Sequence, residues 1–103
     1  MVVPESQLVP AVAGERAAGR RVAVMSGCFD LLCVDDVRAI QSAAAGADRL
    51  VVLVHDDESA RALNGPGRPI IAAAERAELV AGLRGVDYVT VCSSAGVDRL
   101  LAL

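Results

Sequence analysis

The side chains best suited to chemistry lie in one short stretch, GCFDLLCVDD, at residues 27–36. It joins a short hydrophobic run to the start of a helical pattern. Such a junction often binds a phosphate in α/β proteins, because backbone N–H groups and the positive end of the helix dipole converge there. Here the stretch ends in Asp35 and Asp36, whose negative charges would repel a phosphate. These two carboxylates therefore need an explanation.

Two interpretations of the acids remain open. Asp30, Asp35 and Asp36 could bind Mg²⁺ together, since hard carboxylate oxygens suit that ion. Alternatively, Asp35 is the N-cap of a helix and Asp36 is an acid in its first turn, where negative charge is stabilising. The second interpretation is favoured, because it holds for any helix with or without a ligand.

The cysteines and the single histidine are further candidates. Cys33 stands near the same helix start and could be a nucleophile or redox thiol, but no histidine lies near it in the sequence to act as a base, so a partly buried filler is favoured. Cys28 and Cys92 are expected in the core. Three cysteines without a C-x-x-C pair argue against a disulfide framework or a closed zinc site. His55 ends a hydrophobic run, where α/β proteins bind ligands, and could contact a nucleotide or a sugar hydroxyl.

Two arginines are candidate phosphate ligands. Arg68 lies in the loop sequence GPGRP, and Arg76 lies near the start of an amphipathic pattern. The planar guanidinium suits anions. The alternative is that Arg76 pairs with a neighbouring acid and that Arg68 is solvated.

The elements that must position these residues alternate along the chain. Hydrophobic runs predict strands over 20–26, 48–55 and 86–92, the second of them central because it is apolar on both faces. Helices are predicted over 8–19, 35–46, 56–64, 72–85 and 96–103, with a loose tail over 1–7 and a loop over 65–69. Asp56 or Asp57 is expected to cap the helix over 56–64. Strands alternating with helices predict an α/β domain with a parallel three-stranded sheet, spanning 11–103 after an N-terminal tail at 1–10.

Composition excludes several classes of function. The 103 residues are 54% hydrophobic with a net charge of −3, no tryptophan and only two other aromatic residues, so a nucleic-acid partner is not expected. The N-terminus is a poor signal peptide and no apolar run is long enough to span a membrane. Reduced thiols and these absences predict a cytoplasmic protein without a membrane partner.

Three stretches together resemble the nucleotidyltransferases of the cytidylyltransferase superfamily, and most closely the heptose-1-phosphate adenylyltransferases that make ADP-heptose. They are GCFDLL (27–32), DRLVV through GPGRPI (48–70) and ERAELVAGLRGVDYV (75–89). The resemblance covers about residues 11–103 and implies a Rossmann-like (HUP-type) fold. It also implies attack of a sugar or alcohol phosphate on the α-phosphate of ATP or CTP, with Mg²⁺ as the cofactor of any retained catalysis. The candidate nucleotide- or phosphate-binding residues, including the histidine considered above, are Gly27, Cys28, Phe29, Asp30, His55, Arg68 and Arg76.

The chain departs from the signature of that family, Gly-x-Phe-Asp-x-x-His-x-Gly-His. Cys33, Asp35 and Asp36 replace the first histidine, the glycine and the second histidine, and Asn64 stands where close relatives have lysine. Losing one transition-state donor typically costs about 10²–10³ in rate. The sequence therefore predicts a degenerate domain with little catalysis, which keeps weak affinity for a nucleotide or sugar phosphate or acts through a partner. An active transferase that uses Mg²⁺ and a partner chain, and a structural interaction module, remain as alternatives.

The resemblance also implies that part of the family domain is missing. SSAGVDR at 93–99 superficially resembles a late phosphate-clasping motif, but it follows the third strand rather than the fifth. In the family two further strands pair beyond the strand at 20–26, which here is expected to have an open edge. Because open edges tend to pair, a longer parent protein, a homodimer or a partner protein is expected to complete the sheet.

Overall fold

The hydrophobic run at residues 49–55 forms the central strand of a parallel sheet in the computed structural model, which describes all 103 residues. The strand order is β1-β2-β3. In chain order the elements are α1 (Glu5–Ala17), β1 (Val22–Gly27), α2 (Val34–Ala45), β2 (Arg49–His55), α3 (Asp57–Asn64), α4 (Ala73–Ala81), β3 (Tyr88–Cys92) and α5 (Ser94–Leu101). The predicted element order, the Rossmann-like α/β class and the central position of β2 are confirmed.

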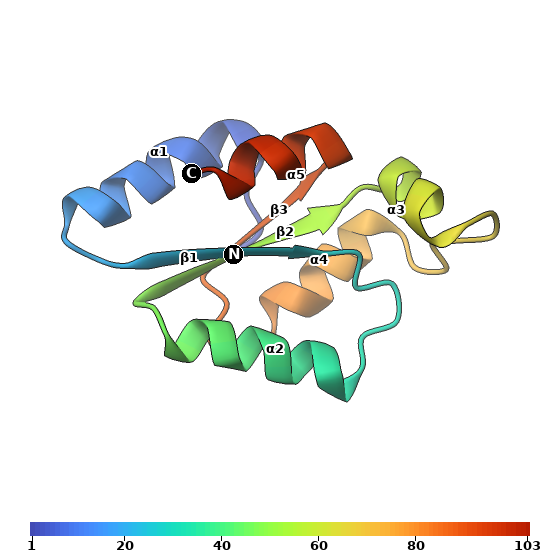
Figure 1. The fold of residues 1–103 in the computed structure, drawn as a ribbon, viewed down its shortest axis with the longest axis horizontal. Helices are drawn as coiled ribbons and strands as arrows, with labels where there is room; N and C mark the ends of the chain where they lie inside the picture. Colours follow the sequence, from blue (N-terminus) through green and yellow to red (C-terminus); the bar gives the residue numbers. More distant parts are fainter.

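Helices cover both faces of this sheet, with α1 and α5 on one side and α2 and α4 on the other (Figure 1). Side chains of β2 alternate between the two layers, as the period of a strand requires. Val51 and Leu53 pack with α1 and α5, whereas Leu50, Val52 and Val54 pack with α2 and α4. All five are fully buried, which explains the uninterrupted apolar run.

The two edges of the sheet differ. β3 is bordered by the N-terminal residues, because Val89 donates a hydrogen bond to the Met1 carbonyl and accepts one from Val3 N–H. β1 lies at the other edge, as expected, and its six residues are only half-buried. No helix in the structure combines the length and the apolar character that crossing a lipid bilayer would require.

Residues 1–7 are more ordered than the loose tail predicted from the sequence. Val3 is buried beside β3, and α1 already begins at Glu5 and continues through Pro10. Leu8 and Val12 are buried on the helix face that packs on the sheet. Burial of these side chains outweighs the weak local propensity, because most helix stability in proteins comes from tertiary packing.

Several helix ends also differ from the prediction. The N-cap of α2 is Cys33 rather than Asp35, so both aspartates lie in the first turn. α4 ends at Ala81, before Gly82, and α5 begins at Ser94 because the Ser93 hydroxyl accepts a hydrogen bond from Gly96 N–H. The prediction of an aspartate cap for α3 is confirmed, and the cap is Asp56.

A polar network joins α1 to β2 and β3. The Tyr88 hydroxyl donates to Glu15 Oε1 at 2.9 Å, and Arg20 and Arg49 each lie 3.1 Å from Glu15 Oε2. The hydrogen bond from Tyr88, helped by the two arginines, holds the pKa of Glu15 below its usual 4.5 despite desolvation. The same hydrogen bond raises the pKa of Tyr88 above 10.0.

This network predicts a loss of stability at both pH extremes. The lowered pKa of Glu15 means that its stabilisation is present above pH 4.5 and is lost as the pH falls through the folded-state value. The raised pKa of Tyr88 means that its stabilisation is present below pH 10.0 and is lost as the pH rises. Urea unfolding across pH should show both losses. Tyr88→Phe should flatten the alkaline limb, and an unchanged alkaline limb would disprove this assignment.

Candidate functional site

The residues singled out in the sequence gather where the strands end. The loop after β1 (28–33), the end of β2, and the loop between α3 and α4 (65–72) lie at the same edge of the sheet, beside the start of α2 (Figure 1). This carboxyl edge is where parallel α/β proteins bind ligands. The contacts made by each candidate residue show which of them could meet a ligand.

Gly27 and Phe29 shape the loop after β1. A Cβ on Gly27 would lie only 2.8 Å from Phe29 Cζ, so the ring packs directly over the glycine. Phe29 has φ = 52°, a left-handed conformation that is uncommon for a bulky residue. Its ring packs against the apolar cluster beneath α2 and α4, which helps to hold this strained backbone. Both residues therefore serve the shape of the loop.

Asp30 fastens this loop to the loop before α4. It is only 4% exposed, and its carboxylate accepts hydrogen bonds from Ile70 N–H at 2.8 Å and Ile71 N–H at 2.9 Å, as well as an ion pair from Arg68. Burial raises the pKa of Asp30, but the hydrogen bonds from Ile71, Ile70 and Arg68 outweigh it and hold the pKa below 3.8. Its oxygens are thus already used within the chain.

Arg76 is completely buried and joins three segments. Its guanidinium donates to the Cys28 carbonyl at 2.5 Å, the Ile71 carbonyl at 2.8 Å and Asp57 Oδ1 at 2.8 Å. Arg76 does pair with an acid, but that acid is Asp57, 19 residues away, rather than a sequence neighbour. The guanidinium has no exposed surface and so is not placed to meet a phosphate in this structure. Arg68 is not simply solvated, since it is paired with Asp30 and remains about one-third exposed.

The first turn of α2 supplies its own anion. Asp36 Oδ2 accepts a hydrogen bond from Cys33 N–H at 3.1 Å and another from the Cys33 thiol at 3.3 Å. Asp35 and the Cys33 side chain are exposed. The predicted helix-stabilising role of these acids is therefore realised, but Asp36 rather than Asp35 makes the capping hydrogen bond.

The three aspartates do not fit a Mg²⁺ site. Asp30 is directed to the loop before α4, whereas Asp36 bonds to the N-cap residue of its own helix. No three His, Cys, Asp or Glu side chains lie close enough to hold a metal ion. The expectation of a shared metal site on Asp30, Asp35 and Asp36 is corrected on these grounds.

The remaining cysteines and the histidine differ in environment. Cys92 is buried, and burial raises its pKa to about 11, as expected for a core thiol. Cys28 is half-buried, and its carbonyl is an acceptor for Arg76. His55 is half-buried at the end of β2, and its Nδ1 is the one buried side-chain polar atom without a hydrogen-bond partner. The Nδ1 atom itself is closed to a ligand, so a ligand contact by His55 would have to use the exposed part of the ring at this edge of the sheet.

Two hollows are present on the surface, and neither includes a signature residue. One, of about 350 Å³, is lined by Glu75, Glu78 and Leu79. The other, of about 390 Å³, is lined by Gln41, Ala44, Ala45, Arg84 and Gly85. The carboxyl edge thus carries the family signature without a closed cavity.

Comparison with known proteins assigns the family. The family model described as "Cytidylyltransferase-like" matches residues 24–102, more than three-quarters of the chain. The chain belongs to the cytidylyltransferase-like family. The match includes most of β1, the signature loop, both arginines and β3, so the resemblance inferred from the three sequence stretches is confirmed.

Relatives of this cytidylyltransferase-like chain include proteins named "Bifunctional protein HldE". The protein from Shewanella piezotolerans is 43% identical over 101 residues, and that from Alkalilimnicola ehrlichii is 46% identical over 100 residues. These matches cover 98% and 97% of this chain, but only 21% of each relative. The chain therefore spans about a fifth of the length of these relatives.

A solved structure supports the fold. The crystal structure of the lipopolysaccharide core biosynthesis protein from Thermoplasma volcanium matches with a TM-score of 0.73 and 24% identity. The match covers 82% of this cytidylyltransferase-like chain and 67% of that chain. Because the two sequences are only 24% identical, the similarity concerns the fold alone, and it supports the Rossmann-like fold of this domain.

One important residue of the site escaped the sequence analysis. Asp57 was considered only as a possible cap of α3, yet its Oδ1 accepts hydrogen bonds from Ala73 N–H at 2.9 Å and from Arg76. It therefore caps the start of α4 from another helix. Nothing in the local sequence reveals this role, because the partners are 16 and 19 residues away.

Proposed function

We propose that this chain is a degenerate nucleotidyltransferase-like domain related to heptose-1-phosphate adenylyltransferases, with little transfer activity of its own. One observation carries the proposal. At the start of α2, where a phosphate would meet the helix dipole, the Cys33 N–H already donates to the carboxylate of Asp36. The Asp36 carboxylate thus occupies a backbone N–H group that would otherwise be free to bind a nucleotide phosphate.

Electrostatics support the same conclusion. A unit charge about 4 Å from a phosphate charge contributes about 1 kcal/mol of repulsion in water, and more in a less polar cleft. Asp35 adds a second exposed carboxylate in the same turn. The family cations do not compensate, since Arg76 is buried in the scaffold and Arg68 is paired with Asp30.

A weak affinity for a nucleotide or sugar phosphate remains part of the proposal. His55 is half-buried at the end of β2, and Arg68 keeps about one-third of its side chain exposed. Both belong to segments at the carboxyl edge. These groups could bind a hydroxyl or one phosphate, but they do not replace two imidazoles at the transition state.

The proposal also includes completion of the sheet by another segment or chain. β1 is an edge strand with half-buried residues, and unpaired strand edges favour pairing with a further strand. That strand would come from a longer parent protein, from a second copy in a homodimer or from a partner protein.

The test is a pyrophosphate-release assay with heptose 1-phosphate and either ATP or CTP, in the presence of Mg²⁺. The isolated chain should remain close to the rate without protein, and calorimetric titration with either nucleotide should show weak binding. Turnover of about 1 s⁻¹ or faster, in the range of ordinary enzymes, would disprove the proposal. Calorimetry without Mg²⁺ distinguishes direct nucleotide binding from binding of the metal complex.

A further inference from the structure

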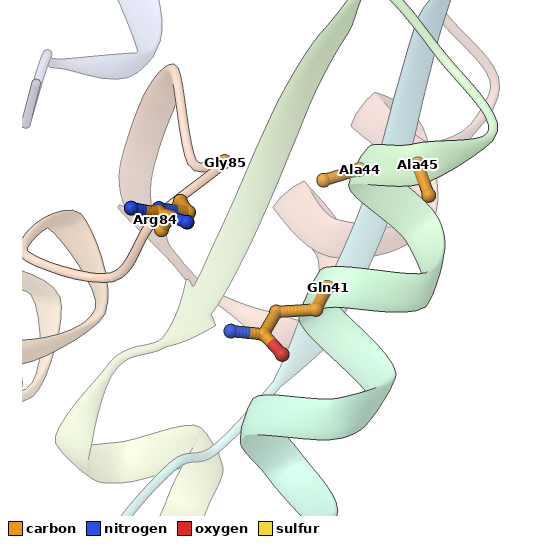
Figure 2. Close-up of a pocket in the computed structure, with 5 residues that line it drawn as sticks. All are labelled: Gln41, Ala44, Ala45, Arg84 and Gly85. Atoms are coloured by element: carbon orange, nitrogen blue, oxygen red, sulfur yellow. The ribbon is translucent and has the colours of Figure 1, made fainter.

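The hollow lined by Gln41, Ala44, Ala45, Arg84 and Gly85 lies away from the signature residues. It is formed by the C-terminal half of α2 and by the turn that follows α4 (Figure 2). Since α2 starts at the carboxyl edge and runs back along the sheet, this hollow lies toward the opposite end of the strands (Figure 1). Its volume of about 390 Å³ is within the usual range for small-molecule sites.

Close packing of small residues forms the floor. A Cβ on Gly85 would lie 2.8 Å from the Ala44 Cβ, so the turn approaches α2 as closely as backbone allows. Gly85 also has φ = 93°, which L residues rarely adopt. The resulting floor presents methyl groups and backbone carbon rather than a long side chain, and so offers apolar contact to a ligand.

The walls carry unpaired hydrogen-bond donors. Arg84 makes no ion pair and no hydrogen bond within the chain, and neither does the Gln41 amide. Figure 2 shows the Gln41 side chain reaching from α2 toward the side of the hollow on which Arg84 lies. Arg38, also unpaired, is three residues before Gln41 and therefore lies on the same stripe of the helix. Most other arginines of the chain are paired, as Arg20, Arg21, Arg49, Arg68, Arg76 and Arg99 are.

We propose that this hollow binds a small molecule that carries one anionic group on a compact apolar body. The Arg84 guanidinium and the Gln41 amide would bind a carboxylate or a phosphate monoester, while Ala44, Ala45 and Gly85 contact the body. The nearby C-terminal end of α2 carries partial negative charge, which opposes any anion and a triphosphate most of all, so binding depends on the Arg84 charge. The other hollow, lined by Glu75 and Glu78, has the opposite charge and would repel such a ligand.

Binding is tested with three probes of similar size, namely benzoate, phenyl phosphate and the neutral benzamide. In ¹H–¹⁵N spectra of the full chain, at least one of the two anions should shift the Gln41 and Gly85 signals saturably. Benzamide should bind about tenfold more weakly or worse, because it lacks the charge. Tighter binding of benzoate than of phenyl phosphate would identify a carboxylate ligand, and the reverse order a phosphate ligand.

Variants distinguish binding of the anion in this hollow from its nonspecific attraction to any exposed arginine. Arg84→Gln should weaken binding of the better anion about tenfold or more, while Arg61→Gln, which removes another unpaired arginine on α3, should leave it unchanged. Ala45→Leu should also abolish the shifts by filling the hollow without changing charge. Equal weakening by Arg84→Gln and Arg61→Gln, or the absence of saturable shifts with both anions, would overturn the proposal. Circular dichroism checks that each variant is folded.

Discussion

Replacing Arg76 by methionine is expected to lower the free energy of unfolding by about 2–4 kcal/mol, because it removes the shared donor of two loop carbonyls and leaving such an acceptor unpaired typically costs about 1–3 kcal/mol. The guanidinium is fully buried and hydrogen-bonds to Asp57 and to the carbonyls of Cys28 and Ile71. Methionine fills much of the same volume but leaves these acceptors without a donor. The loop after β1 and the start of α4 should loosen together, because Arg76 joins them.

Urea denaturation followed by circular dichroism measures this effect. Arg61→Met is the matched control, because Arg61 is exposed on α3 and unpaired, and such surface changes usually stay within about 0.5 kcal/mol. If Arg76→Met were as stable as Arg61→Met, Arg76 would not hold the scaffold and could again be considered a ligand for phosphate.

Restoring the family signature is expected to raise nucleotidyl transfer by about 10²–10³ over the wild type. The triple variant Cys33→His, Asp35→Gly and Asp36→His removes two carboxylates and supplies two imidazole donors at the start of α2. It also frees the Cys33 N–H that Asp36 now occupies. Pyrophosphate release with ATP or CTP and heptose 1-phosphate is the measurement.

A second triple variant, Cys33→Ala, Asp35→Gly and Asp36→Ala, separates charge from catalysis. It removes the same acids and includes the same glycine, which costs about 1 kcal/mol of helix stability. Nucleotide binding should strengthen in both variants, whereas transfer should rise only in the one with histidines. Equal rates for a folded histidine variant and the wild type would show that other missing parts limit catalysis.

The architecture could be predicted from the sequence because it depends on local patterns. The uninterrupted, valine-rich apolar run at 50–54 favours a short strand buried on both faces, and Gly and Pro at 65–69 exclude regular structure. The resemblance to the cytidylyltransferase superfamily rested on several such stretches together. The order of residues 1–7 was missed because it depends on Val3, which is buried beside β3 and hydrogen-bonds to Val89 far along the chain.

The roles of the site residues could not be predicted in the same way, because they depend on long-range contacts. Asp30 receives its hydrogen bonds from residues 40 and 41 positions later, and Arg76 reaches Cys28 across 48 positions. The sequence alone does not distinguish an arginine that binds phosphate from one that is buried and joins parts of the fold. The first residues of the family signature, Gly27 to Asp30, are kept in this chain. They set the shape of the loop after β1 and hold it against the loop before α4.

The most direct test of the account follows the Cys33 amide in ¹H–¹⁵N spectra during titration with ATP. The central claim is that Asp36 occupies the anion position at the start of α2. The Cys33 signal should therefore stay in place in the wild type and should shift saturably in Asp36→Ala, which removes the acceptor as well as the charge, with the exposed Asp98→Ala as the matched control. A saturable shift of the Cys33 amide in the wild type, equal to that in Asp36→Ala, would contradict the claim.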